Sequence, residues 1–424
     1  MIVAPARRAA YEVLLRVSEE GAYADRALRS ASAELDDRDR ALARQLAFGS
    51  VQRMRTLDHA IEKLGKRPVR KLDPPVKAAL RLGGYQLGYL DGVPRYAAVN
   101  ESVELVRGAK LERAVPFTNA VLRRLADGIE QLLAGLPEGP LKHSYPDWVW
   151  EVWRRDLGEE EALALMRAQN ESPPVVVRHV RGQTPDGSET DIPHAYEVAR
   201  VDEKALENGH IWPQSRASQL AGLCVGSQPG ERVLDLCAAP GAKTTHIAAL
   251  MGGVGTIVAV ERHAGRADAL RRTAARMGAE DAIEVRTADA AGPHEPGAYD
   301  RVLVDPPCSD LGTLASRPDA RWRKAADAPA RLAREQAAIL GAAADALLPG
   351  GTLVYSTCTI SPAENEGVVQ SFLAARADFE AVDLRSDVPL WNHERVPGFA
   401  QTLPHRDGTE GFFFARLRRR EVAL

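Results

Sequence analysis

Two cysteines follow two strand-like segments in the second half of the chain. Cys308 lies in DRVLVDPPCSD and Cys358 lies in GGTLVYSTCTI. Because ligands of an open parallel sheet bind at the carboxyl ends of its strands, we expect both thiols to face the same edge. A single cysteine is more often a small buried apolar residue than a reactive group. Two of them in turns rich in Pro, Ser and Thr instead indicate covalent catalysis, in which a thiolate divides one difficult step into two easier ones.

A loop of small residues follows an earlier strand-like segment, VLDL, in the sequence CAAPGAKTTHIAAL. Gly241 lets the backbone approach a ligand closely, and the helix that follows offers free N–H groups. A triphosphate-binding loop is excluded, because Cys237 and Ala242 stand where that loop needs glycine. A dinucleotide fingerprint is excluded too, since GVG at 253–255 precedes the second strand and lacks the third glycine. The pattern that fits is a loop for S-adenosylmethionine (SAM).

Acidic residues accompany the first three strands. Asp235 lies within the first strand, near the expected position of the positive end of SAM. Glu261 ends the second strand, TIVAVE, where a carboxylate can accept hydrogen bonds from both ribose hydroxyls. Asp289 follows the third strand and is expected to meet the adenine amino group. A single acid at such a position usually caps the next helix, but three of them around this loop favour a cofactor site.

A thiol beside a methyl donor suits one reaction in particular. Carbon 5 of cytosine is a poor nucleophile, and a thiolate that adds to carbon 6 makes carbon 5 able to accept a methyl group. Asp305, in DPPC, can hydrogen-bond the ring edge and stabilise the charge that develops there. A base must then remove the proton from carbon 5, and Asp305, Cys308 and water are all candidates.

The elements that position these residues alternate between strands and helices from about residue 213 onward, which predicts a parallel sheet with crossover helices. The expected strands are 232–236, 256–261, 283–287, 301–305 and 352–356, with later ones near 380–382 and 411–417. The expected helices between them include 244–251, 264–277 and 330–348. Residues 5–130 show helical spacing interrupted by Pro and Gly, which predicts an all-α domain of six or seven helices. We therefore expect three domains: 1–130, a small mixed region at 131–212, and 213–424.

Composition narrows the class of protein. The chain of 424 residues has no apolar run long enough to span a bilayer and no pattern of a signal peptide, so a cytoplasmic protein is expected. Four cysteines and ten histidines show no metal-ligand spacing, which predicts no zinc site. The first 130 residues carry 23 Lys and Arg against 17 Asp and Glu, in a chain of net charge −3, and this local excess is compatible with RNA binding. Cys224 is expected to be a packing residue, and His246 a packing or surface residue rather than a catalytic base. RLRRR at 416–420 is expected to be a solvated tail rather than a nucleic-acid clamp.

At these residues the sequence resembles the RNA (cytosine-C5) methyltransferase family. The resemblance rests on the cofactor motif, on DPPCS and on STCT, and it implies a Rossmann-like class I SAM-dependent methyltransferase domain. The cofactor motif is matched by Cys237, Ala238, Ala239, Pro240, Gly241, Ala242 and Lys243. It also implies that Cys358 is the nucleophile and that Cys308 assists release of the methylated base. DNA cytosine methyltransferases use the PPC-type cysteine for attack instead, so no DNA partner is expected.

The resemblance extends over most of the chain. Residues 1–130 resemble the NusB-like, all-α RNA-binding domain of the family, which implies an RNA partner, with 16S ribosomal RNA as the expected substrate. SRPDARW at 316–322 is similar to the segment after the release cysteine and is expected near the RNA, and GTEGFFFARLRR resembles the closing strand. Residues 181–211 look shorter than the family's insert. The same chemistry on transfer RNA or another RNA, and a non-catalytic RNA-binding assembly factor, remain alternatives.

Overall fold

The computed structural model describes residues 3–388 and 391–421, and the chain divides into two compact units. Unit 1 comprises Met1–Glu171 and Leu314–Ala325. Unit 2 comprises Ser172–Thr313 and Ala326–Leu424. The domain boundaries expected at residues 130 and 212 stay predictions.

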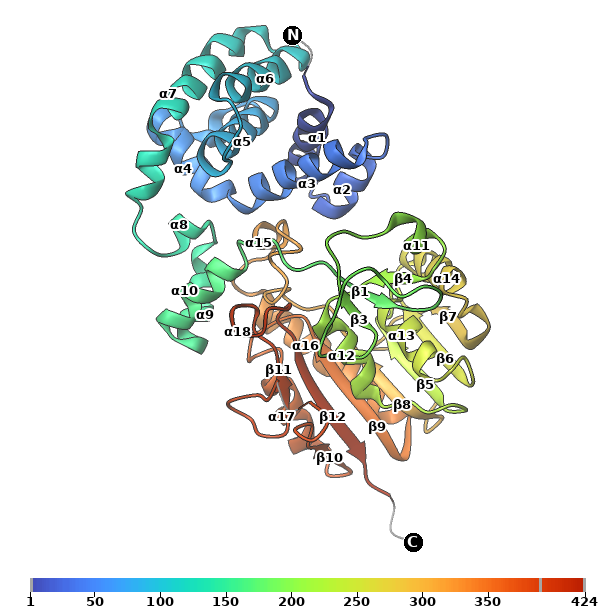
Figure 1. Ribbon diagram of the computed structural model, residues 1–424. Coiled ribbons are helices and arrows are strands. Elements are labelled where there is room, and N and C mark those ends of the chain that lie inside the picture. The colour runs from blue at the N-terminus through green and yellow to red at the C-terminus, as the bar shows by residue number, and fades with distance from the viewer. Residues whose placement is uncertain (1–2, 389–390, 422–424) are drawn as a thin grey trace. The chain divides into compact units, whose positions relative to one another are not determined.

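Unit 1 is helical (Figure 1). Its α-helices are α1 (Pro5–Glu19), α2 (Ala24–Ala31), α3 (Asp37–Gln52), α4 (Met54–Gly65), α5 (Pro74–Tyr89), α6 (Arg95–Gly108), α7 (Val115–Ala134), α8 (Pro140–His143), α9 (Asp147–Leu157), α10 (Glu159–Ala168) and α15 (Ala320–Arg323), with 3-10 turns at Val69–Lys71 and Glu112–Ala114. Local sequence sets several starts. Asp36 caps α3 by accepting a hydrogen bond from the Asp39 amide, and prolines occupy the first turns of α1, α5 and α7.

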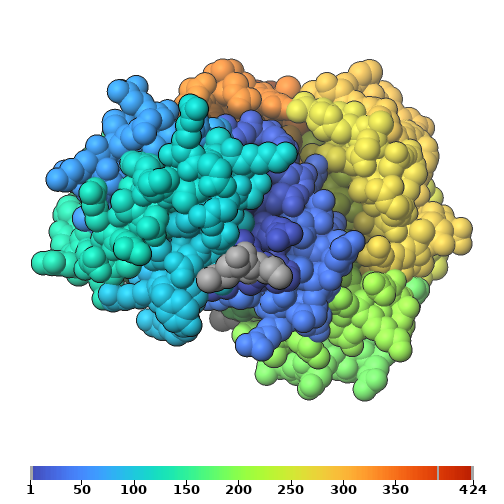
Figure 2. All heavy atoms as spheres, turned by 90° about the horizontal axis from the view of Figure 1, so that it is seen from above, coloured from blue at the N-terminus to red at the C-terminus, as the bar shows by residue number. Residues whose placement is uncertain are grey.

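The helices of unit 1 pack closely because small residues lie where they cross. At Gly83 in α5, a Cβ atom would lie only 2.4 Å from the Leu122 side chain of α7. Leu14, Leu46 and Leu57 are buried in the same apolar core. In the space-filling view the first helices (blue) lie against the later ones (cyan) (Figure 2). The expectation of a helical N-terminal region is confirmed.

The segment Leu314–Ala325 packs within unit 1, although the residues on both sides of it belong to unit 2. Arg321 is fully buried, donates hydrogen bonds to the Asn170 side chain (2.8 Å) and the Gln169 carbonyl (2.7 Å), and lies over the Tyr145 ring. Trp322 donates its indole N–H to the Val51 carbonyl. SRPDARW at 316–322 was expected near the RNA. Its second arginine, Arg321, is instead buried, and its guanidinium forms hydrogen bonds within unit 1.

Unit 2 contains a large mixed sheet in the order β10-β12-β9-β8-β5-β6-β7, with β11 paired to β12. Its strands are β5 (Arg232–Leu236), β6 (Thr256–Glu261), β7 (Ile283–Thr287), β8 (Tyr299–Val304), β9 (Leu347–Thr357), β10 (Phe379–Val382), β11 (Ala400–Gln401) and β12 (Phe413–Arg419). β5 to β9 pair in parallel with one another, whereas β12 pairs antiparallel with both β9 and β10. The strand order reverses between β5 and β8, which is where ligands bind in such sheets.

Helices cover both faces of this sheet (Figure 1). They are α12 (Arg216–Val225), α13 (Ala242–Leu250) and α14 (Ala264–Met277) on one face, and α16 (Ala328–Ala346) and α17 (Glu366–Ala375) on the other. Two short helices, α11 (Glu203–Glu207) and α18 (Pro404–Asp407), lie in connections. This doubly covered sheet confirms the expected α/β fold class.

A second, antiparallel sheet in the order β2-β3-β1-β4 also belongs to unit 2. Its strands are β1 (Val176–His179), β2 (Ser188–Glu189), β3 (Ala195–Glu197) and β4 (Ile211–Pro213). Arg178 of β1 is buried and donates to the hydroxyl of Thr245 in α13 (2.9 Å). The small sheet is thereby tied to the helix that follows the cofactor loop.

The helix expected at 330–348 is present with shifted bounds, and the expectation for the C-terminal arginines was wrong. The helix expected at 330–348 ends at Ala346, because Leu347 already pairs with Tyr299 as the first residue of β9. RLRRR at 416–420 is not a solvated tail. Arg416 and Arg419 lie in β12, and the Arg416 guanidinium donates to the Cys224 carbonyl (2.8 Å). Within the described part of the chain, every helix falls short of the length and apolarity needed to cross a membrane.

Candidate active site

The loop expected to hold SAM joins β5 to α13 at the reversal of strand order. Its backbone is shaped for close approach, since Cys237 (φ 65°) and Gly241 (φ 102°) both adopt positive φ. At Gly241 a Cβ atom would lie 3.2 Å from Leu270, which disfavours any side chain there. The loop is held to β6 by the hydrogen bond from the Ala238 amide to the Val260 carbonyl. Gly241 then precedes the first turn of α13, whose amides face the loop.

Three acids of the expected cofactor site occupy different environments. Asp235 is buried and accepts a hydrogen bond from the Thr244 hydroxyl (2.6 Å), while its Oδ1 has no hydrogen-bond partner among the described residues. Burial raises the pKa of Asp235 to about 7. Glu261 is buried, accepts from the His263 amide and pairs with Arg266 (3.3 Å). Asp289 is exposed and accepts from the Ala291 amide. An unsatisfied buried carboxylate oxygen beside a tight glycine loop fits the sulfonium and amino end of SAM, which would satisfy it.

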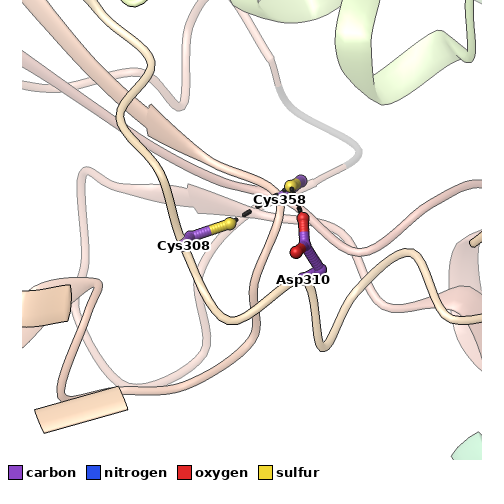
Figure 3. Close-up of side chains that lie close together, drawn as sticks. All are labelled: Cys308, Asp310 and Cys358. Atoms are coloured by element: carbon purple, nitrogen blue, oxygen red, sulfur yellow. Dashed lines mark hydrogen bonds between the residues drawn. The ribbon is translucent and has the colours of Figure 1, made fainter. Parts of the chain in front are cut away.

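The side chains of Cys308 and Cys358 are in contact. The Sγ atoms of Cys308, after β8, and Cys358, after β9, lie 3.2 Å apart (Figure 3). Cys308 is 5% exposed, and Cys358 is more open to solvent. The hydrogen bond with Cys358 and then burial raise the pKa of the Cys308 thiol well above its usual value. A raised pKa favours the protonated form of Cys308, which can then act as a hydrogen-bond donor to a neighbouring sulfur.

Buried polar side chains fix the two cysteine loops to each other. The hydroxyls of Ser309 and Thr359 lie 2.7 Å apart, and the Gly312 amide donates to the Cys358 carbonyl (3.1 Å). Glu364 is fully buried and accepts hydrogen bonds from both the amide and the hydroxyl of Ser309. Because both loops share these bonds, the separation of the sulfurs is set by the fold rather than by free side-chain rotation.

A lysine–aspartate pair adjoins the cysteines. Lys243, the last residue of the cofactor motif, donates to Asp305 (2.7 Å), and its ammonium lies over the Phe412 ring. Burial lowers the pKa of Lys243, but the Asp305 carboxylate and, to a smaller extent, Cys358 raise it by more, so that it lies above its usual range. Lys243 thus carries a positive charge that interacts electrostatically with the Cys358 side chain.

Sequence reasoning missed several residues that shape this site. Asp310 lies 3.5 Å from the Cys358 sulfur through its Oδ1, at a positive φ of 62°. Glu364 and Gln336, which donates to both Glu364 and the Pro307 carbonyl, were not singled out either. Asp310 is two residues from a cysteine already identified, so proximity in sequence was an available signal. Glu364 and Gln336 gave none, because only folding buries them together.

The structure also tests the expectations for Cys224 and His246. Cys224 is buried in the apolar core, and burial raises the pKa of its thiol to about 12, as befits a packing residue. His246 is also buried, and burial lowers its pKa to about 3, so that it is neutral. Both packing predictions are confirmed. The structure brings Asp305, Cys308, Cys358 and Lys243 together and sets Glu261 and Asp289 at the ends of the neighbouring strands.

Comparison with known proteins identifies the family. The model described as 16S rRNA methyltransferase RsmB/F matches residues 223–418, and the NusB family model matches residues 4–127. A probable ribosomal RNA small subunit methyltransferase B of Synechocystis sp. is 34% identical and covers 98% of this chain and 99% of its own. The ribosomal RNA small subunit methyltransferase B of Thermus thermophilus is 36% identical, with 97% of each chain covered.

A solved structure agrees on the fold. The crystal structure of PH0851 superposes with a TM-score of 0.84, at 24% identity, over 99% of this chain and 100% of the other. The family models and the curated relatives confirm the resemblance to RNA methyltransferases with a NusB-like region. The chain belongs to the RsmB/F family of 16S rRNA methyltransferases, SAM-dependent enzymes, and carries a NusB-family helical region at its N-terminal end.

Proposed function

We propose that this protein, in the cytoplasm, methylates carbon 5 of a cytosine in 16S ribosomal RNA, with Cys358 as the nucleophile and Cys308 assisting release. The observation that carries the proposal is the 3.2 Å contact between the sulfurs of Cys308 and Cys358, the second of which is more open to solvent, beside a loop that fits SAM. SAM, when bound, supplies the electrophilic methyl group. Ala238, Ala239, Pro240, Gly241 and Ala242 would lie along it, and Asp235, Glu261 and Asp289 would accept its hydrogen bonds.

The Cys358 sulfur starts the reaction by forming a bond to carbon 6 of the cytosine, and the electron pair of the C5–C6 double bond becomes available at carbon 5. Lys243 favours the thiolate that attacks. Asp305, held by Lys243, accepts a hydrogen bond from the exocyclic amino group and fixes the ring. After carbon 5 has gained the methyl group, a base, for which Asp305, Cys308 and water are the candidates, accepts its proton. The electron pair of that C–H bond restores the C5–C6 double bond as the C6–S bond breaks, and the electron pair of the C6–S bond returns to Cys358. The thiol of Cys308 donates a hydrogen bond to that departing sulfur and so stabilises it as a leaving group.

RNA binding is supported by a basic surface on unit 1, which we call the α4–α7 patch. Its members are exposed cations around the end of α4 and the middle of α7, namely Lys63, Lys66, Arg67, Arg70, Lys71, Arg123 and Arg124. The two helices touch here, because the Arg124 guanidinium donates to the Leu64 carbonyl and Arg67 lies over the Phe117 ring. Clustered cations of this kind bind nucleic-acid phosphates without regard to sequence.

The experiment that tests the chemistry uses 16S rRNA fragments containing 5-fluorocytosine, which cannot lose a proton from carbon 5. The wild-type protein with SAM should form a covalent adduct that survives denaturing electrophoresis. Cys358→Ala should form none, and an adduct in that variant would overturn the assignment. With ordinary cytosine, Cys308→Ala should accumulate adduct that the wild type does not.

The substrate is tested separately by bisulfite sequencing of total RNA from cells with and without the protein. A single cytosine of 16S rRNA should lose its methylation when the protein is absent. Loss confined to transfer RNA would overturn the proposed substrate while leaving the chemistry intact.

A further inference from the structure

Three potential metal ligands converge at the cysteine pair. The Sγ atoms of Cys308 and Cys358 and a carboxylate oxygen of Asp310 all lie within 4.8 Å of one another (Figure 3). We propose that these three side chains form a binding site for a thiophilic divalent cation, with Zn²⁺ as the best fit, and that the bound cation reversibly inactivates the enzyme. The binding is independent of the proposed function, whereas the inactivation rests on it.

The distances suit tetrahedral zinc. Two Zn–S bonds of about 2.3 Å at a tetrahedral angle separate the sulfurs by about 3.8 Å, and one Zn–S and one Zn–O bond separate sulfur from oxygen by about 3.5 Å. The Cys358 sulfur lies 3.5 Å from Asp310 Oδ1, so this edge of the site already has the required length. The two sulfurs lie 3.2 Å apart and need to separate by only about half an ångström.

The surrounding structure holds the ligands in place before a cation arrives. The loops are joined through Ser309 and Thr359, and through the backbone bond between Gly312 and Cys358. Asp310 has a left-handed backbone conformation, which directs its side chain back toward the cysteine of the other loop. Ligands fixed in this way lose little conformational entropy when the ion binds.

The donor set selects the class of ion. Two sulfurs and one carboxylate oxygen favour Zn²⁺ over Mg²⁺ or Ca²⁺, which prefer oxygen ligands alone. Three protein ligands leave a fourth tetrahedral position for water. Binding replaces the thiol protons, so Zn²⁺ and two thiols give the bis-thiolate complex and two protons, and the affinity should rise with pH.

The linear sequence predicted no zinc site because its ligands come from two loops. Cys308 and Cys358 are 50 residues apart, and short ligand spacings of the zinc-finger type are absent from the sequence. Only the neighbouring positions of β8 and β9 in the sheet bring them together. When the Cys358 sulfur binds a cation, the electron pair that would attack cytosine forms the metal–sulfur bond instead. We therefore expect the bound cation to inactivate the enzyme.

The test is a titration of the full-length protein with Co²⁺ alone, under anaerobic conditions in a phosphine reductant. Wild-type protein should show sulfur-to-cobalt charge-transfer absorption in the near ultraviolet, and equimolar Zn²⁺ should abolish it. Cys358→Ala and Cys308→Ala should each lose the signal, whereas Cys224→Ala, which removes a buried thiol elsewhere, should retain it. Absence of the signal in wild-type protein, or its persistence in Cys358→Ala, overturns the proposal.

Asp310→Asn tests the oxygen ligand with little change to the backbone, because asparagine also tolerates a left-handed conformation. The variant should bind Co²⁺ about 10- to 100-fold more weakly, the scale of losses seen when groups supporting a metal site are removed. Zn²⁺ should inhibit methylation by the wild type, a chelator should restore it, and Asp310→Asn should need correspondingly more Zn²⁺. Equal inhibition of both proteins overturns the site. If the cobalt titrations of wild type and variants give the results expected above, but Cys358→Ala still forms the 5-fluorocytosine adduct, the metal site is supported and the proposed function is overturned.

Discussion

Lys243 and Asp305 form an ion pair of 2.7 Å that joins the cofactor loop to the turn after β8. The pair is largely buried, and the ammonium interacts electrostatically with Cys358 as well. One residue thus connects the expected methyl-donor loop, the residue expected to orient cytosine, and the proposed nucleophile.

Replacing Lys243 with Gln should lower kcat/KM at neutral pH by about tenfold, the equivalent of about 1.4 kcal/mol, because the cation that favours the Cys358 thiolate is lost. The acid limb of the pH–rate profile should move to higher pH. Lys243→Arg keeps the charge and should retain the wild-type profile. An unchanged profile in Lys243→Gln would show that the lysine acts only in structure.

Asp235→Asn should change how the stability of the SAM-free protein depends on pH. The pKa of Asp235 is raised by burial to about 7, above its unfolded value near 3.8, so the folded state holds a proton that the unfolded state releases between these values. The contribution of Asp235 to the free energy of unfolding of the wild type therefore falls as pH rises from about 4 to about 7.

Asparagine cannot ionise but can still accept the hydrogen bond from Thr244. The variant should gain stability relative to wild type between pH 5 and pH 8, by roughly 1–3 kcal/mol. Urea denaturation of both proteins at a series of pH values measures the difference. A difference that stays constant with pH would contradict the raised pKa.

Ser309→Ala removes a hydroxyl that bonds to both Thr359 and Glu364. The buried Glu364 carboxylate loses a donor, so the free energy of unfolding should fall by about 1–3 kcal/mol. Because the cysteine loops are then less firmly joined, adduct formation should slow while the Kd for SAM stays unchanged. Ser371→Ala, at an exposed hydroxyl on α17, is the control and should alter neither quantity.

Arg321→Met should destabilise unit 1, since it removes a buried charged donor from the Gln169 carbonyl and the Asn170 side chain. Burial lowers the pKa of Arg321 to about 10, so the guanidinium stays charged in the interior and its hydrogen bonds offset the loss of water. The expected loss in the free energy of unfolding is about 2–4 kcal/mol. Arg8→Met, at an exposed position on α1, should change stability by less than about 0.5 kcal/mol.

Reversing two charges of the α4–α7 patch, in Arg123→Glu/Arg124→Glu, should raise KM for RNA with little change in kcat. The dependence of binding on salt should also become shallower, because fewer counterions are released per complex. The control is Arg272→Glu/Arg276→Glu on α14, which changes the net charge equally at exposed positions of unit 2. Equal effects of the two double variants would mean that total charge matters and the patch does not.

The sequence determined the strand pattern and the reactive residues. β5, β6 and β7 have the expected bounds because β-branched and aliphatic residues recur in each short segment, continuously in β6 and alternating with charged residues in β7. Cys308, Cys358 and the loop before α13 were identified because their residue types are unusual at strand ends. The expected roles of these residues stay predictions until the variants are made.

The tertiary structure determined which residues are neighbours in space. The ends of β9 and β12 differed from expectation because pairing with β8 and β10 extends the strands beyond the local pattern. The burial of Glu364 and Arg321, the 3.2 Å sulfur contact and the position of Asp310 all join residues from separate parts of the chain. The local sequence does not predict these contacts, because burial and electrostatic interactions depend on residues that become neighbours only in the folded chain.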